Sequence, residues 1–313
     1  MKLFIIFISI LLVAVAPFYG QIDLTFDEII NDKSMQYQVF WDLRFPRIIL
    51  AFLTGAILGL AGLIFQTVFR NPMSTPFTLG VASGATLFTA ISIVFGIVTY
   101  VSFFAFLGSL LTIIILFFIT SKLKDVNTTS LLLVGIALSF FYSACLMVLF
   151  FISDLSQSYE IVRFTMGSLD VVGFRDVYFM IFASSIILIV TNIYKKDIKL
   201  LLVSYEFAQL KGVNVKKTNY ILLFVVSISV GICVSITGPI GFIGLIIPHV
   251  LKTLYKKSSE QLILPIFFYG GVFLVLCDFI ARNLDENSDI PIGVITSFLG
   301  APFFIYLILS KKK

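Results

Sequence analysis

Residues 238–257 read GPIGFIGLIIPHVLKTLYKK, so residues that break helices interrupt an apolar run. The interrupting residues are Gly238, Pro239, Gly241, Gly244 and Pro248. From position 218 to position 250 the chain carries no Asp, Glu, Lys or Arg. Non-helical backbone at membrane depth is tolerated only where protein or a water-filled cavity covers it. The stretch therefore predicts a membrane protein whose broken helices line a path, rather than one that is merely anchored.

The composition predicts a polytopic membrane protein. Of 313 residues, 59% are hydrophobic and 12% are charged, whereas soluble domains carry about 25% charged residues. The basic residues fall in short loops and form no long stripe with interleaved aromatics, which argues against nucleic-acid binding. Cys145, Cys233 and Cys277 lie in apolar runs without a C-x-x-C pair, so we expect packing residues and no metal site.

Apolar runs recur along the whole chain, and a helix crosses the bilayer with about 20 such residues. They predict about ten transmembrane helices in a single domain over residues 1–313, because no polar segment could bury a core of its own. The expected spans are 3–19, 46–69, 77–98, 100–121, 130–152, 177–194, 218–237, 240–251, 262–281 and 291–309. The first run resembles a signal peptide, but further spans follow it, so we expect a retained helix.

The distribution of basic residues predicts the orientation. With ten spans and both termini in the cytoplasm, 16 of the 22 Lys and Arg residues fall on the inner side, as the positive-inside rule requires. Spans 2–5 and 7–10 then run in opposite directions, which fits an inverted repeat. No G-x-x-x-x-G-K-[ST] motif occurs, so we expect this chain not to bind nucleotide by that route.

Arginines stand where the outer ends of two spans are expected. Arg44 and Arg47 flank Pro46 at the start of span 2, and Arg282 follows Asp278 by four residues at the end of span 9. That spacing predicts an ion pair between Asp278 and Arg282. Two interpretations of the arginines stay open. They anchor helix ends at the headgroups, or they form a docking face for an acidic partner, because arginine forks suit carboxylates.

Two inner segments carry polar residues. After span 2, Pro72 and Pro76 stop the helix, and Asn71 must be satisfied or face water. Within the inner segment 195–217, residues 204–213 predict one short amphipathic helix that Gly212 can cap. Such a helix is either a surface filler or a handle for a cytoplasmic partner.

Together these stretches resemble the FecCD-type permeases, the membrane subunits of bacterial ABC importers for iron–siderophores, haem and vitamin B12. Nine motifs stand in the order of that family from about residue 43 to 309. They are R-F-P-R (44–47), G-A-x-L-x-x-x-G (55–62), Q-x-x-x-R-N-P (66–72), L-G-V-x-x-G-A (79–85), M-G-S-L (166–169), G-V-N-V (212–215), G-P-I-G-F-I-G-L-I-I-P-H (238–249), D-x-x-x-R (278–282) and P-I-G-V-I-T-x-x-x-G-A-P-F-F (291–304).

The resemblance implies an all-α permease of the type II ABC importer architecture, spanning the bacterial cytoplasmic membrane beside a second permease. Two cytoplasmic ATPase subunits would bind ATP and Mg and drive it, so this chain would be no enzyme and would hold no cofactor. An extracytoplasmic binding protein would deliver the cargo, with its glutamates on Arg44, Arg47 and Arg282.

The resemblance also implies an ATPase contact and a cytoplasmic gate. The coupling residues would be Ser204, Glu206, Ala208, Leu210, Gly212 and Val213, and the gate residues Asn71, Met73, Thr128 and Thr129. Met73 stands where the family usually has Leu and keeps its bulk. The run Ser204-Tyr205-Glu206 replaces a common leucine-glycine-glutamate run, so the first turn of the coupling helix is expected to differ.

The expected function is import of an iron chelate by alternating access. Ferric siderophore is the commonest cargo of such permeases, and haem and cobalamin are the alternatives within the family. A rival of another class is a secondary transporter driven by an ion gradient, because broken helices and a carboxylate such as Asp278 inside an apolar run suit it as well.

Overall fold

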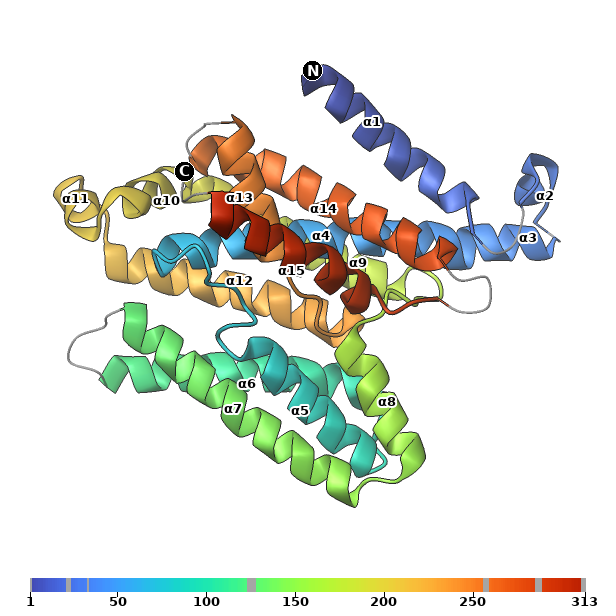
Figure 1. The fold of residues 1–313 in the computed structure, drawn as a ribbon, viewed down its shortest axis with the longest axis horizontal. Helices are drawn as coiled ribbons and strands as arrows, with labels where there is room; N and C mark the ends of the chain where they lie inside the picture. Colours follow the sequence, from blue (N-terminus) through green and yellow to red (C-terminus); the bar gives the residue numbers. More distant parts are fainter. Residues whose placement is uncertain are drawn as a thin grey trace.

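The computed structural model describes residues 2–20, 24–32, 34–122, 128–255, 259–284 and 289–310. All regular structure within these ranges is helical (Figure 1). The helices that correspond to the expected spans are α1 (Lys2–Val15), α4 (Phe45–Val68), α5 (Val81–Val94), α6 (Val101–Lys122), α7 (Thr128–Ile152), α9 (Arg175–Ile193), α12 (Val215–Thr237), α13 (Ile243–Tyr255), α14 (Ser259–Asn283) and α15 (Ile292–Ser310).

Shorter helices lie in the connections. They are η1 (Ala16–Phe18), α2 (Phe26–Ile30), α3 (Met35–Gln38), the π-helical η2 (Val39–Arg44), η3 (Val98–Tyr100), α8 (Leu155–Met166), α10 (Lys195–Val203) and α11 (Tyr205–Leu210). Among the described residues, 6 helical stretches are long and apolar enough to cross a membrane, and shorter apolar helices accompany them. The protein is thus an all-α, multi-pass membrane protein.

Helix α4 forms the centre of the bundle, and every residue from Leu53 to Val68 in it is buried. Small residues let neighbouring helices approach it closely, as in other membrane helix pairs. A methyl group on Gly55 would overlap the backbone of Gly270 in α14, and one on Gly62 would overlap the carbonyl group of Gly244 in α13. The glycines therefore set the distance from α4 to α13 and α14.

The two expected repeats correspond to α4–α7 and α12–α15. Helix α4 packs against α14 of the other half, and α12 packs reciprocally against α6. Helices α4 and α12 run in opposite directions, and in each half the second helix is short and begins inside the bundle (Figure 1). This reciprocal packing is the arrangement that an inverted repeat predicts.

One expected boundary was wrong. The span expected at 77–98 is helical only over Val81–Val94 and η3, because Gly80 takes a left-handed conformation (φ 78°) and ends the preceding turn. The connection between α7 and α9 contains α8. Asp154 caps this helix in a reciprocal box with Gln157, a D-x-x-Q signature that the sequence displays.

The two ends of the bundle differ in charge. The start of α4 and the end of α14 lie at one end (Figure 1), called here the arginine end because Arg44, Arg47 and Arg282 stand at these helix ends. Helices α10 and α11 lie at the opposite end, called here the lysine end because Lys195, Lys196, Lys199 and Lys211 stand there (Figure 1).

Candidate functional site

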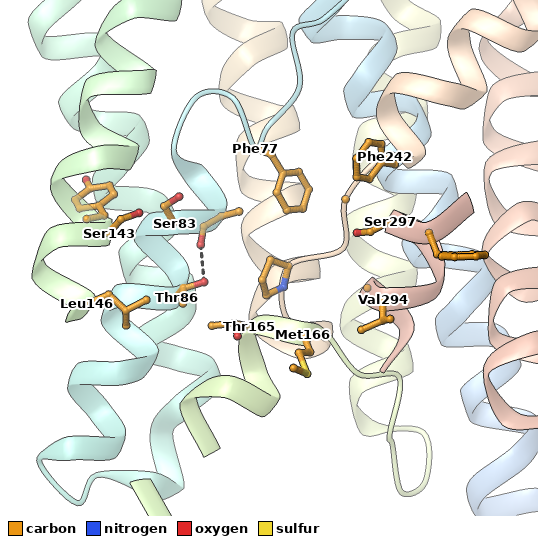
Figure 2. Close-up of a pocket in the computed structure, with 16 residues that line it drawn as sticks. Phe77, Ser83, Thr86, Ser143, Leu146, Thr165, Met166, Phe242, Val294 and Ser297 are labelled. Atoms are coloured by element: carbon orange, nitrogen blue, oxygen red, sulfur yellow. Dashed lines mark hydrogen bonds between the residues drawn. The ribbon is translucent and has the colours of Figure 1, made fainter. Parts of the chain in front are cut away.

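A cavity of about 780 Å³ lies where the broken segments of the two halves meet (Figure 2). We call it the α5–α15 cavity. Its walls come from α5, α7, α8, α15 and the loop 238–242, and no charged residue lines it within the part of the chain that the structure describes. The lining residues are Phe77, Ala82, Ser83, Thr86, Tyr142, Ser143, Leu146, Thr165, Met166, Pro239, Gly241, Phe242, Gly293, Val294, Ser297 and Phe298. The cavity can therefore hold a bulky solute that needs no counter-ion from the protein.

Irregular backbone shapes this cavity. Gly238 and Phe242 both have φ of 67°, and this conformation is uncommon for a bulky residue such as Phe. The Phe242 ring packs against Gly300, where a methyl group would overlap it. Ser168 N donates to the carbonyl oxygen of Thr237 at 2.8 Å and fixes the loop to the end of α8. The helix-breaking residues of the sequence thus form a wall of the cavity.

At the arginine end, Arg47 lies among three carboxylates. Its Nε donates to Asp278 Oδ1 at 2.9 Å, and its Nη1 lies 3.2 Å from Asp170 Oδ1 and 2.5 Å from Asp289 Oδ2. Arg282 Nε lies 2.9 Å from Asp278 Oδ2, close enough for an ion pair but not aligned as a hydrogen bond. The Asp278–Arg282 pair is therefore part of a larger cluster, with Asp278 completely buried.

Two of the arginines also hold the end of the first helix. Arg44 Nη1 lies 3.2 Å from the carbonyl oxygen of Phe18 and donates to it. Arg282 donates to the carbonyl oxygens of Tyr19 and Ala16 at 3.2 and 3.3 Å. Carbonyl groups at a helix C-terminus lack partners within the helix, and cations near that end are favourable. The two guanidiniums supply these partners.

All three arginines that the sequence singled out for docking line one cavity of about 430 Å³, together with Asp170, Asp176 and Asp289. We call it the arginine cavity. The structure thus brings Arg44, Arg47 and Arg282 together, but each is already bonded internally and little exposed, at 5% for Arg282 and 7% for Arg44. Their role in docking stays a prediction.

Asp170 lies in the connection between α8 and α9 and faces Arg47 and Arg163. Burial alone would raise its pKa. A hydrogen bond from Ser168 and the charges of Arg47 and Arg163 outweigh burial, so the pKa of Asp170 is lowered from the ordinary 3.8. The sequence drew no attention to Asp170 or Asp289, because their nearness to Arg47 comes only from the fold.

At the lysine end, the residues after α4 contact the segment between α10 and α11. Arg70 Nη2 donates to the carbonyl oxygen of Val203 at 3.2 Å and lies 5.6 Å from the centre of the Tyr205 ring. The hydroxyl of Tyr205 donates to the carbonyl oxygen of Val68. These contacts join the expected gate to the expected coupling segment. In the sequence, Tyr205 stands out only as a departure from the family pattern.

The expected gate residues lie beside this contact. Asn71 Oδ1 accepts from Met73 N at 2.9 Å in a tight turn, and Met73 is 51% exposed. Thr128 and Thr129 begin α7, but their side chains fall outside the described residues. Their place in a gate stays a prediction.

The one short helix expected within residues 204–213 is α11, and a second helix, α10, precedes it. The two helices meet at Ser204, because that residue is extended (φ −163°) and caps α11 by accepting from Phe207 N. The segment ends at Gly212, whose φ of 84° suits glycine. Val213 N then bonds to the carbonyl oxygen of Ala208 at 3.0 Å.

The remaining coupling residues differ in exposure. Ala208 is fully buried, whereas Leu210 is 85% exposed and Glu206 is also exposed. Leu210 and Glu206 both stand exposed on the short helix α11. They are therefore suitable contacts for another protein.

The profile of the FecCD transport family matches residues 3–310. The chain belongs to this family. The hemin transport system permease HmuU of Yersinia pestis is 34% identical over 100% of this chain and 97% of its own length. The molybdate import system permease MolB of Haemophilus influenzae is 31% identical over 95% of this chain and 88% of its own length. Like these relatives, this FecCD-family chain is a permease of an ABC importer.

One solved structure is similar to this chain throughout its length. It is described as an inward-facing conformation of a metal-chelate type ABC transporter, and it matches 98% of this chain and 99% of its own with a TM-score of 0.87 and 28% identity. The fold class expected from the sequence, a polytopic ABC importer permease, is confirmed. Family membership displaces the rival interpretation of an ion-driven secondary transporter.

Proposed function

We propose that this permease carries an iron chelate, with a ferric siderophore as the preferred cargo, across the cytoplasmic membrane through the α5–α15 cavity. The observation that carries the proposal is a lining of aromatic, aliphatic and hydroxyl-bearing residues without a charge around about 780 Å³. A large chelate shields its metal with its own ligands, so it needs shape and a few hydrogen bonds rather than counter-ions.

The uncharged lining argues against a small oxyanion such as molybdate. Anions in proteins are held by arginine, lysine or clustered backbone N–H groups, and charge-assisted bonds are the strong ones. Haem and cobalamin are bulky chelates as well, and they remain the alternatives within the same proposal. The arginines of the chain lie outside this cavity, which agrees with a role in protein contacts.

Transport requires partners. We propose a second permease copy or homologue, two ATPases at the lysine end and a binding protein at the arginine end, with both termini in the cytoplasm. The lysine-rich loops support this orientation, and the exposed Leu210 supports a contact with an ATPase. ATP binding would bias the permease pair between outward-open and inward-open states, because a ligand shifts an equilibrium by its differential affinity for the two states.

Docking at the arginine end would use Arg44, Arg47 and Arg282. An acidic side chain of the binding protein would enter the arginine cavity and take over bonds that Asp170 or Asp289 now makes to Arg47. In this proposal the carboxylates of the permease hold the arginines in place until the partner arrives.

Uptake into proteoliposomes tests the proposal. The permease is reconstituted with its ATPase and binding protein, and accumulation of ferric siderophores, haem, cobalamin and molybdate is compared. We expect ATP-dependent accumulation of a ferric siderophore and none of molybdate. A matched pair, Ser297→Arg in the α5–α15 cavity and Ser185→Arg on the exposed surface of α9, separates a blocked path from a general effect of charge. Molybdate uptake, or equal transport by both variants, would contradict the proposed cavity and cargo.

A further inference from the structure

A different cavity, of about 1010 Å³, opens between α6 and α9 toward the arginine end. Both helices pack against α12, which forms its floor through Ile232 and Ile236, whereas α6 and α9 make at most slight contact with each other within the described residues. We call it the α6–α9 groove. It lies apart from the α5–α15 cavity and shares no lining residue with it.

The groove changes from polar to apolar along the helices. At its mouth stand Tyr100, Arg175 and Asp176, and farther along stand Phe103 and Phe182. Phe182 follows Arg175 by seven residues, which places it about 10 Å deeper at 1.5 Å per residue. Both phenyl side chains are exposed, at 56% and 60%. A groove with a polar mouth and an aromatic interior suits a molecule with a charged head and an apolar tail.

Within the described residues, neither charge at the mouth is bonded to a protein partner, although Asp176 also lines the arginine cavity. No hydrogen bond or ion pair joins the side chain of Arg175 or of Asp176 to another described residue, whereas Arg44, Arg47 and Arg282 at the same end are all bonded. Consecutive helical residues do not face each other, so Arg175 and Asp176 do not neutralise one another. The mouth therefore offers a cation and an anion side by side.

We propose that the α6–α9 groove binds one phospholipid that carries both a phosphate and a primary ammonium group, as phosphatidylethanolamine does. Arg175 donates to the phosphate oxygens, since guanidinium–phosphate bonds are strong and often bidentate. Asp176 accepts from the ammonium group. One acyl chain lies along Phe103 and Phe182 above α12, where the protein leaves α6 and α9 apart. Tyr100 marks the headgroup level, where tyrosines are enriched in membrane proteins.

The charge pattern separates this lipid from others. Phosphatidylglycerol would place a negative headgroup without a cation against Asp176. Phosphatidylcholine has the right charges, but its quaternary ammonium has no N–H to donate to the carboxylate. The proposal therefore predicts an order of affinity in which phosphatidylethanolamine comes first.

Native mass spectrometry of the full chain in mild detergent tests the order. The chain is mixed with equimolar phosphatidylethanolamine, phosphatidylglycerol and phosphatidylcholine that have identical acyl chains. We expect a single phosphatidylethanolamine adduct about tenfold more abundant than the others, which corresponds to about 1.4 kcal/mol. A preference for phosphatidylglycerol, or no preference among the three, would overturn the proposal.

Variants locate the site. Arg175→Ala should reduce all three adducts about tenfold, and Asp176→Asn should abolish the preference for phosphatidylethanolamine over phosphatidylcholine while lipid still binds. The matched control is Lys216→Ala, which removes an exposed cation at the lysine end and should keep the wild-type pattern. Wild-type adducts in Arg175→Ala would overturn the assignment.

A pair of uncharged variants guards against effects of misfolding. Ser102→Phe fills the α6–α9 groove from an exposed position on α6, and Ser185→Phe adds the same ring at an exposed position of α9 outside it. Both variants should elute as monodisperse protein. We expect the adduct to disappear in Ser102→Phe and to persist in Ser185→Phe, and the reverse result, or no difference, would refute the site.

Discussion

Arg47 and Asp278 are 231 positions apart in the sequence, yet Arg47 Nε donates to Asp278 Oδ1 at 2.9 Å. Asp278 is completely buried, and Arg282 approaches its other oxygen. One carboxylate thus joins the start of α4 to the end of α14. Because Arg47 also contacts Asp170 and Asp289, it ties the connections before α9 and α15 to the same point.

Arg47→Met should destabilise the fold. The change leaves Asp278 with one cation and removes one of the partners of Asp170 and of Asp289. We therefore expect a loss of about 3 kcal/mol in the free energy of unfolding, as for other broken buried pairs. Chemical unfolding in detergent measures it. Arg163→Met is the control, because the Arg163 side chain is 62% exposed and such pairs contribute about 0–1 kcal/mol. Equal losses in the two variants would contradict the special position of Arg47.

Stability should depend on pH through Asp170. Its pKa is lowered in the folded protein, so Asp170 contributes stability above its ordinary pKa of 3.8 and loses it as pH falls through the lower folded value. Asp170→Asn should therefore be less stable than wild type at pH 7, and the gap should close as pH falls below about 3.8. Melting temperatures of both proteins, measured from about pH 7 down to about pH 3, check this. A gap that stays constant to the acid limit would exclude Asp170 as the cause.

Tyr205→Phe should weaken the coupling of ATP hydrolysis to transport. The change keeps the ring near Arg70 but removes the hydroxyl bond to the carbonyl oxygen of Val68. In the reconstituted importer we expect uptake to fall several-fold while ATP hydrolysis stays within about twofold, since chemistry occurs in the partner and only transmission is impaired. Tyr306→Phe, at a residue of α15 that is 65% exposed, is the control. Parallel loss of both activities would indicate a general defect instead.

Gly62→Ala should lower the stability of the folded protein. Its methyl group would overlap the carbonyl group of Gly244, and overpacking of this kind costs about 1–3 kcal/mol. Gly241→Ala is the matched control, because nothing lies within 4 Å of a methyl group there. Thermal melting in detergent compares the two. Equal melting temperatures would mean that α13 can move away from α4 without cost.

The sequence predicted the class of the fold and most helices, because apolar runs report burial in lipid directly. It also predicted the Asp278–Arg282 contact, which depends only on helical spacing. It could not predict that Arg47 lies beside Asp170 and Asp289, since loops 100 or more residues apart meet only through the packing of α4 on α14. The contact of Arg70 with Val203 could not be predicted from the sequence for the same reason.

The hydrogen bonds from Arg44 and Arg282 to the backbone carbonyl oxygens of residues 16–19 have a practical consequence. The chain contains one tryptophan, Trp41, whose ring lies 5.1 Å from Phe40, and Phe40 in turn lies 5.2 Å from Phe18. A protein that pulls on either guanidinium would disturb this aromatic chain. The intrinsic emission of the permease is then a label-free optical signal for events at its arginine end.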